Sequence, residues 1–123
     1  MEKIYTKNAP EAIGPYSQAM KVGNILFTSG QIAIDPKTSQ VEATDIIRQT
    51  EQVCQNLSAI LEVAEASFEN VIKTTCFLAD MNDFAAFNEI YSKYFTSNPA
   101  RSCVAVKTLP KNVLVEIEVI AEI

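Results

Sequence analysis

The 123-residue sequence contains no histidine, and it has only three glycines and three cysteines. The absence of histidine excludes histidine-based nucleophilic triads and removes the commonest metal ligand. Cys54, Cys76 and Cys103 are odd in number, far apart and in no CxxC spacing. This arrangement predicts neither a disulfide framework nor a zinc site, so we expect three reduced thiols, no metal and no cofactor.

The sequence also lacks blocks of like charge and long apolar runs. Ten basic and fifteen acidic side chains give a net charge of −5, which argues against a nucleic-acid groove or an anionic membrane surface. No stretch approaches the roughly 18 apolar residues of a membrane helix, and the amino terminus has no apolar signal-peptide core. We therefore expect a cytoplasmic protein without a nucleic-acid or membrane partner.

Glycine and proline are few and scattered, and no repeat or linker divides the chain, so residues 1–123 are expected to form one domain. Gly23-Asn24 can adopt the positive φ angles of a tight hairpin between two apolar-rich runs. The pattern predicts, in order, strands over 18–22, 25–29 and 31–34, a turn at 35–38, a helix over 46–64, a strand over 70–79, a helix over 84–95, and strands over 101–107 and 113–121.

Both helices are predicted by apolar residues that recur at three- and four-residue steps. The first helix, over 46–64, has about twenty residues, and the second begins at Asn82 or Asp83 as its cap. The order of elements suits an α+β fold, in which one antiparallel or mixed sheet carries two helices on one face. The other face of such a sheet still needs cover.

The last two strands place charges among apolar residues. One face of the final strand is apolar, whereas the other carries Glu116 and Glu118, and in the preceding strand Arg101 and Cys103 point the same way. Whether Arg101 meets Glu116 depends on a register that the sequence does not fix. Two interpretations remain open: a solvated surface with weak ion pairs, or a face closed against other subunits with its charges in a partly buried cleft.

Short segments along nearly the whole chain resemble the Rid family of reactive-intermediate deaminases, also known as liver perchloric-acid-soluble proteins and described as translation-inhibiting ribonucleases. The matching segments are AP (9–10), GPYSQ (14–18), FTSGQ (27–31), QT (49–50), Gln52, Asn56, VIKTT (71–75), DMNDF (80–84), Asn88, Tyr91, RSCV (101–104), LP (109–110) and VEIE (115–118). The family's fold is similar to that of trimeric chorismate mutases, so the resemblance implies a homotrimer with a barrel-like sheet core and clefts between subunits.

The resemblance also implies an activity that needs no cofactor. Rid proteins hydrolyse short-chain 2-imino acids and their enamine tautomers, such as 2-iminopropanoate and 2-iminobutanoate, to 2-oxo acids and ammonia. These reactive species arise when pyridoxal-phosphate enzymes dehydrate serine or threonine. An iminium carbon is already electrophilic, so water can attack it without a covalent nucleophile or a metal, which suits this chain.

The family match gives roles to two charged residues. Arg101 is expected to hold the substrate carboxylate through two parallel hydrogen bonds, the alternative being a structural ion pair with Glu116 or Glu118. Glu116 corresponds to the glutamate that positions water and moves a proton. Burial would raise its pKa and a nearby arginine would lower it, so the sequence leaves the net direction open. Glu118 is expected to be structural or to lie at the rim of the site.

Five further residues are candidates at the same site. Tyr16 follows the rigid Gly14-Pro15 pair and is a catalytic candidate, although a core tyrosine is nearly as plausible. The substrate-binding candidates are Ser29, Gly30, Asn88 and Cys103. For Cys103 we expect the backbone to face the substrate, because no histidine is present to activate its thiol.

Two alternatives to the deaminase are kept: a non-catalytic relative that binds a small carboxylate metabolite in the subunit clefts, and an endoribonuclease. The ribonuclease ranks last because the chain lacks histidine and a basic track for phosphate. Two positions also depart from common family patterns. Glu65 replaces a glycine and is expected to shift the end of the first helix, and Ser39-Gln40 replaces a commoner glycine in the preceding turn.

Overall fold

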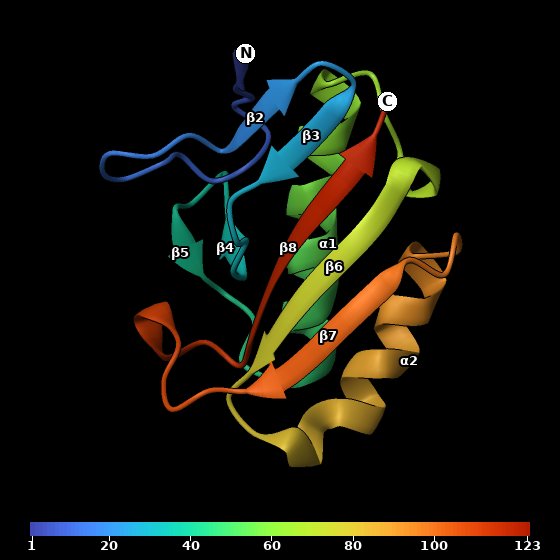
Figure 1. Cartoon of the computed structure of the whole chain (residues 1–123). Coiled ribbons are helices and arrows are strands. Elements are labelled where there is room, and N and C mark those ends of the chain that lie inside the picture. Colours follow the sequence, from blue (N-terminus) through green and yellow to red (C-terminus); the bar gives the residue numbers. More distant parts are fainter.

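The computed structural model describes all residues, 1–123, as a curved sheet with two helices on one face (Figure 1). The strands are β1 (Glu2–Ile4), β2 (Ala19–Val22), β3 (Ile25–Thr28), β4 (Ile34–Asp35), β5 (Gln40–Val41), β6 (Val71–Leu78), β7 (Ala100–Ala105) and β8 (Val115–Glu122). The helices are α1 (Ile46–Val63) and α2 (Phe84–Tyr94), with short 3-10 turns at Phe68–Asn70, Met81–Asp83 and Pro110–Asn112. The α+β class and the two helices on one face are confirmed.

Six strands form the main sheet in the order β1-β2-β3-β8-β6-β7, and β4 and β5 form a separate hairpin. All neighbouring pairs are antiparallel except β6 and β7, which run parallel because α2 crosses between them. The last two strands of the chain, β7 and β8, therefore lie on opposite sides of β6 (Figure 1). No register can make Arg101 and Glu116 cross-strand neighbours.

Most predicted elements are confirmed, and the deviations occur in the short segments. The hairpin at Gly23-Asn24 joins β2 to β3, and α1 and α2 match the apolar periodicity. The strand predicted over 31–34 is wrong, because Gln31 forms only an isolated bridge with Ile117 and β4 begins at Ile34. Strands of two or three residues, such as β1, β4 and β5, are too short to show a period in the sequence.

The cap position predicted for the second helix is confirmed at Asp83, although the side chain of Asp83 does not cap the helix. Asp83 makes no side-chain hydrogen bond at the start of α2, and the chain enters α2 through the 3-10 turn Met81–Asp83. Asp80 caps that turn, since its carboxylate accepts a hydrogen bond of 2.8 Å from the Asn82 backbone N–H. The preceding helix, α1, is capped by Asp45, which accepts from the Arg48 N–H at 2.9 Å.

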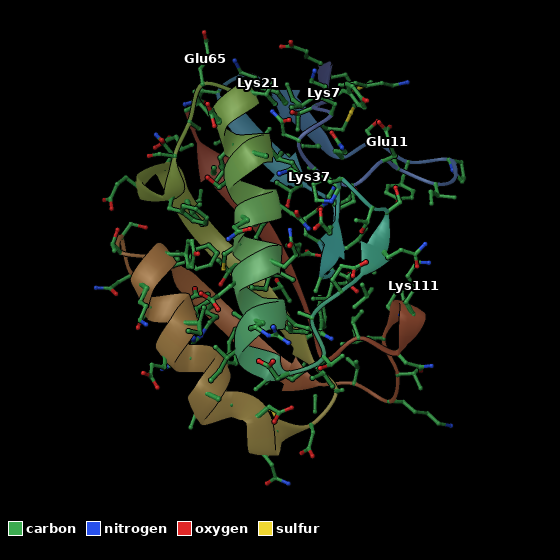
Figure 2. The ribbon with its side chains drawn as sticks, turned by 180° about the vertical axis from the view of Figure 1, so that it is seen from behind. Lys7, Glu11, Lys21, Lys37, Glu65 and Lys111 are labelled. Atoms are coloured by element: carbon green, nitrogen blue, oxygen red, sulfur yellow. The ribbon has the colours of Figure 1, made fainter.

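Glu65 and Ser39 both adopt the left-handed conformation that glycine favours, with φ near 61°. α1 ends at Val63 with Ala64 as its C-cap, so Glu65 takes the left-handed position after the helix despite its side chain. Figure 2 shows Glu65 beyond the end of α1.

The face of the sheet beneath the helices forms the core. Along β8 the residues predicted to face the helices are all buried: Val115, Ile117, Val119 and Ala121. They belong to one cluster of 21 buried residues, which includes Leu57 and Ile60 of α1 and Phe87 of α2. Alternation along β8 fixes the opposite orientation for Glu116 and Glu118.

No helix covers the other face of the sheet (Figure 1). The strand register places apolar side chains on it beside the glutamates, since Phe77 pairs with both Glu116 and Val104. Phe27 and Val104 remain 45% and 47% exposed. In a single protomer this open face is therefore partly apolar. Neither helix is long and apolar enough to cross a membrane.

Candidate functional site

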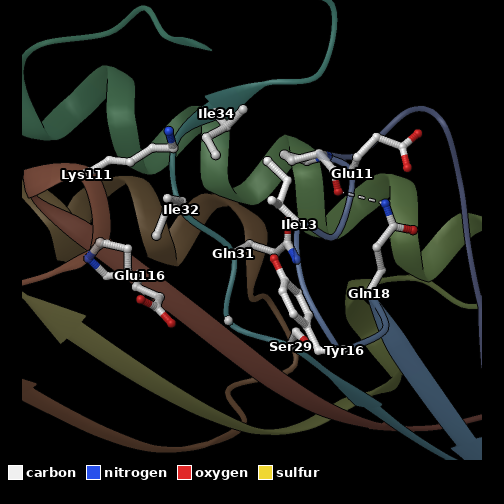
Figure 3. Close-up of a pocket in the computed structure, with 13 residues that line it drawn as sticks. Glu11, Ile13, Tyr16, Gln18, Ser29, Gln31, Ile32, Ile34, Lys111 and Glu116 are labelled. Carbon is white, nitrogen blue, oxygen red and sulfur yellow. Dashed lines mark hydrogen bonds between the residues drawn. The ribbon is translucent and has the colours of Figure 1, made fainter. Parts of the chain in front are cut away.

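A pocket of about 500 Å³ opens beside the start of β8 (Figure 3). Its wall combines the loop before β2, the segment between β3 and β4, and the turn before β8. The 13 lining residues are Pro10, Glu11, Ile13, Tyr16, Gln18, Ser29, Gly30, Gln31, Ile32, Ile34, Pro110, Lys111 and Glu116. Of the predicted site residues, the structure brings Tyr16, Ser29, Gly30 and Glu116 together here.

The Glu116 carboxylate lies directly against the backbone of Gly30. A Cβ atom at residue 30 would collide with the Oε2 atom of Glu116 and lie 2.8 Å from its Cδ atom. Only glycine therefore permits this approach, which gives Gly30 a steric reason to lack a side chain. The Glu116 carboxylate thus occupies the space that a side chain at residue 30 would fill, and Tyr16 and Ser29 lie across the pocket from it (Figure 3).

The environment of Glu116 raises the pKa of its carboxyl above the ordinary value. Partial burial is the main cause, because it disfavours the charged form, and the nearby negative charge of Glu118 adds to it. No arginine of the same protomer lowers the pKa of Glu116. The net shift of this pKa, which the sequence left open, is therefore upward. A carboxyl with a raised pKa is suited to exchange protons nearer neutral pH.

The wall that carries Tyr16 is held in place by a buried amide. Gln18 is 3% exposed, and its side chain accepts from the Thr6 N–H at 2.8 Å and donates to the Pro10 carbonyl at 2.8 Å. Ser29 ties the next strand to this loop, since its hydroxyl donates to the Ser17 carbonyl at 2.6 Å. Tyr16 itself is 54% exposed, so the core alternative for it is wrong.

A second hollow, of about 430 Å³, lies between α2 and β7 and contains Arg101. The Nη1 atom of Arg101 donates to the Asn88 Oδ1 atom at 2.6 Å. The guanidinium carbon lies 4.7 Å from the ring centroid of Tyr91 and 5.4 Å from that of Phe84. These contacts fix the plane of an exposed guanidinium, as recognition of a carboxylate requires.

Cys103 lies on the same side of β7 as Arg101, as the alternation predicts. It is half-buried beside Cys76 in the register of the parallel strands. Burial raises the pKa of the Cys103 thiol, although the Arg101 charge partly opposes this effect. Burial also raises the pKa of Cys76 to about 12. These thiols therefore stay protonated near neutral pH, which does not favour a cysteine nucleophile.

The predicted site residues form two groups on opposite faces of the sheet. Arg101 is in register with Thr74, which is buried beneath the helices, whereas Glu116 is in register with Phe77 on the open face. The alternative of an ion pair between Arg101 and Glu116 or Glu118 is wrong for the protomer, whose ion pair joins Arg48 to Asp45. The Arg101 group has a guanidinium that can bind a carboxylate but no carboxyl to move a proton. The Glu116 group has the carboxyl but no arginine.

The sequence analysis missed Lys111, which lines the Glu116 pocket. Its only signal is the Pro110-Lys111-Asn112 segment, where proline starts a turn and asparagine tolerates a left-handed conformation. Ile32 and Ile34 were missed for a different reason. Residues 31–34 were assigned to a strand, although the apolar side chains of Ile32 and Ile34 line the pocket.

The fold agrees with the comparisons with known proteins. Residues 6–123 match the family model described as endoribonuclease L-PSP. A RutC family protein from Pyrococcus horikoshii is 59% identical over 121 residues, which cover 98% of this chain and 96% of the relative. The chain belongs to this L-PSP family, which is also called the Rid or RutC family.

Two solved structures extend the comparison to three dimensions. YyfA from Yersinia pestis, a Rid family protein of unknown function, superposes with a TM-score of 0.96 at 48% identity and covers 99% of this chain and 98% of its own. TdcF from Escherichia coli, solved with bound serine, gives a TM-score of 0.95 at 42% identity and covers 100% and 99% of the two chains. A member of this fold therefore binds a small amino acid.

Proposed function

We propose that the protein hydrolyses the C=N bond of short-chain 2-imino acids, such as 2-iminopropanoate and 2-iminobutanoate. Water adds to the iminium carbon, the resulting carbinolamine loses its nitrogen as ammonium, and the 2-oxo acid remains. The observation that carries this proposal is the Glu116 carboxylate, which has a raised pKa and lies in an open pocket against Gly30.

Glu116 would take a proton from the attacking water and return one to the leaving nitrogen. A single carboxyl can do both, because the iminium carbon needs no further activation. Tyr16 and Ser29 present hydroxyl groups to the same pocket and would orient the water or the nitrogen. The bare backbone at Gly30 would let a planar substrate lie close to the floor.

Arg101 would bind the substrate carboxylate, with Asn88 holding the guanidinium and the Cys103 backbone beside it. Because Arg101 and Glu116 lie on opposite faces of one sheet, the complete site needs two subunits. We propose a homotrimer in which the open faces pack together and the Arg101 group of one subunit meets the Glu116 pocket of the next. The partly apolar open face supports this arrangement.

The experiment that tests the proposal couples a threonine dehydratase to the purified protein in a buffer free of amines. We expect formation of 2-oxobutanoate to accelerate in proportion to added protein. Arg101→Ala and Glu116→Gln should each lower the acceleration by at least about a hundredfold, since each removes a charged contact to the reacting molecule. Arg48→Ala removes an exposed guanidinium of α1 that lies in neither hollow, and it serves as the matched control.

Two outcomes would redirect the assignment. If Arg101→Ala keeps activity within severalfold of wild type, the assigned carboxylate contact is wrong. If the wild type does not accelerate the reaction, the non-catalytic alternative gains support, and small carboxylates such as serine should then raise the melting temperature. The family's endoribonuclease description is tested by incubating RNA with the protein at physiological salt. We expect no cleavage, because the Glu116 pocket contains only one lysine and the chain no histidine.

A further inference from the structure

The turn before β8 has an unusual backbone. Lys111 (φ 55°, ψ 21°) and Asn112 (φ 54°) are consecutive residues in the left-handed region, and neither is a glycine. This conformation is unfavourable for a residue with a Cβ atom, especially for lysine, and it persists only where the surrounding structure imposes it.

Anchors on both sides impose the conformation. Leu109 and Val113 flank the turn and are 8% and 2% exposed. Within it, the Asn112 N–H donates to the Leu109 carbonyl at 3.0 Å. Beyond it, the Leu114 N–H donates at 2.8 Å to the side chain of Gln49, which is itself buried in α1. The turn is therefore rigidly attached to the core, and it presents Lys111 in a defined direction.

That direction is along the wall of the Glu116 pocket. Figure 3 shows the Lys111 side chain extended above Glu116 toward Ile34. Lys111 is the only cation among the 13 lining residues, and it has no ion-pair partner. The other acid of the wall, Glu11, accepts a hydrogen bond from Tyr5, and its carboxylate points away from the pocket. A free ammonium group thus faces a hollow that a short 2-imino acid only partly fills.

We propose that Lys111 is a specificity-determining residue that binds a second carboxylate at the far end of the substrate. The inference rests on the proposed function. With the first carboxylate on Arg101 and the C=N carbon at Glu116, a distal carboxylate lies in the space between Glu116 and Lys111. The substrate class is then extended to 2-imino dicarboxylic acids, such as 2-iminosuccinate and 2-iminoglutarate, which are hydrolysed with higher kcat/KM than monocarboxylic imines.

The test compares 2-iminosuccinate and 2-iminobutanoate, each generated in the cuvette by a flavin-dependent amino acid oxidase with catalase present. Lys111→Met keeps an unbranched side chain that is one atom shorter, and it removes the charge. Lys111→Gly also removes the amine but favours the left-handed turn, so a loss of selectivity in this variant does not reflect misfolding. Lys37→Met removes an exposed lysine that lies outside the pocket and is the matched control.

We expect both Lys111 variants to lower the ratio of kcat/KM for 2-iminosuccinate over that for 2-iminobutanoate by about tenfold, the size of one charged contact near solvent. Lys111→Arg should retain the ratio. An unchanged ratio in Lys111→Met and Lys111→Gly, or a wild type that prefers 2-iminobutanoate, would overturn the inference.

Calorimetry separates this inference from the proposed function. If the wild type hydrolyses neither imine, the deaminase proposal fails, but the binding of stable 2-oxo acids still tests Lys111. We then expect 2-oxoglutarate to bind more tightly than 2-oxobutanoate, with the difference lost in Lys111→Gly. Equal affinities for the two 2-oxo acids would show that Lys111 does not bind the distal carboxylate.

Discussion

The absence of a side chain at Gly30 leaves the space that the Glu116 carboxylate occupies. In Gly30→Ala the new methyl group would occupy the position of the Glu116 carboxylate, which must then turn away from the floor of the pocket. We expect imine hydrolysis to fall by about tenfold to a hundredfold, because a displacement of the reacting group of about 1 Å has such an effect. The rate of 2-oxobutanoate formation measures the loss. A variant with wild-type kcat/KM would show that the carboxylate does not act from this position.

Glu118 allows the electrostatics of Glu116 to be tested. The pKa of Glu116 is raised by burial and then by Glu118, so the ionised form of Glu116 is less favourable in the folded protein than in the unfolded chain. The resulting loss in the free energy of unfolding is absent below the pKa of Glu116 in the unfolded chain, about 4.3. It develops as the pH rises through the higher pKa of Glu116 in the folded protein. Glu118→Gln removes part of it.

We therefore expect Glu118→Gln to lower the pKa of Glu116, measured by carbon NMR of the side-chain carboxyl. The free energy of unfolding should increase at pH 7 by a few tenths of a kcal/mol, as for other exposed charge pairs, and stay unchanged at pH 3. Glu122→Gln, an exposed change at the end of the same strand, is the control. A Glu116 pKa that stays the same or rises in Glu118→Gln would contradict the assigned repulsion.

Among single residues, those whose orientation depends on alternation along a strand could be predicted. The shared side of Arg101 and Cys103, and the burial of the helix-facing residues of β8, follow from a period of two. Lys111 could not be predicted in the same way. Its direction depends on two left-handed residues that are fixed by their buried neighbours Leu109 and Val113 and by Gln49, which comes from a distant part of the chain.

At the scale of elements, the end of α1 offers a prediction on stability. Glu65 has φ 61°, a conformation that costs a residue with a Cβ atom about 1 kcal/mol more than glycine. Part of the gain in Glu65→Gly is lost to the greater entropy of the unfolded chain. We expect a net rise in melting temperature of about 2–4 °C by calorimetry. Glu62→Gly, one turn earlier in regular helix, should lower the melting temperature. A fall in Glu65→Gly would contradict this account.

The helices were the most predictable elements because their apolar residues repeat over several turns. The position of β7 could not be predicted from the residues around Pro110. Their pattern indicates two strands joined by a turn, but it does not show that these strands lie on opposite sides of β6. The crossover through α2 decides it, since a strand that follows a helix pairs in parallel with the strand before that helix. Very short strands such as β4 and β5 are fixed by contacts with the rest of the fold, which their own residues do not encode.

At the scale of the whole molecule, the separation of Arg101 from Glu116 makes a prediction about mixtures. Arg101→Ala and Glu116→Gln should each be inactive alone. If equal amounts are unfolded and refolded together, random assembly of trimers should restore about a quarter of the wild-type activity. Each shared site receives an intact Arg101 from one subunit in about half of the cases, and an intact Glu116 from the next subunit in about half of those. The rate of 2-oxobutanoate formation and the mass in solution are measured on the same sample.

Refolding each variant alone provides the control for this mixture. Sites built within one subunit would show no recovery on mixing, and a stable monomer in solution would remove the proposed shared cleft. Neither the oligomer nor the pairing of the two groups could be derived from the pattern of the sequence alone. The open face is compatible with both a solvated surface and a subunit contact, and the position of the two groups on opposite faces supports the proposed contact.

The position of β7 has a consequence for the newly made chain. β7 pairs only with β6, so its outer edge presents unpaired N–H and C=O groups beside the exposed side chain of Val104. Such an unpaired edge can form hydrogen bonds with a strand of another chain, and it is therefore a starting point for aggregation. If the proposed trimer forms, its assembly competes with precipitation during synthesis, and precipitation is favoured when many unassembled chains are present at once. Slow expression at low temperature should therefore improve the yield of usable protein.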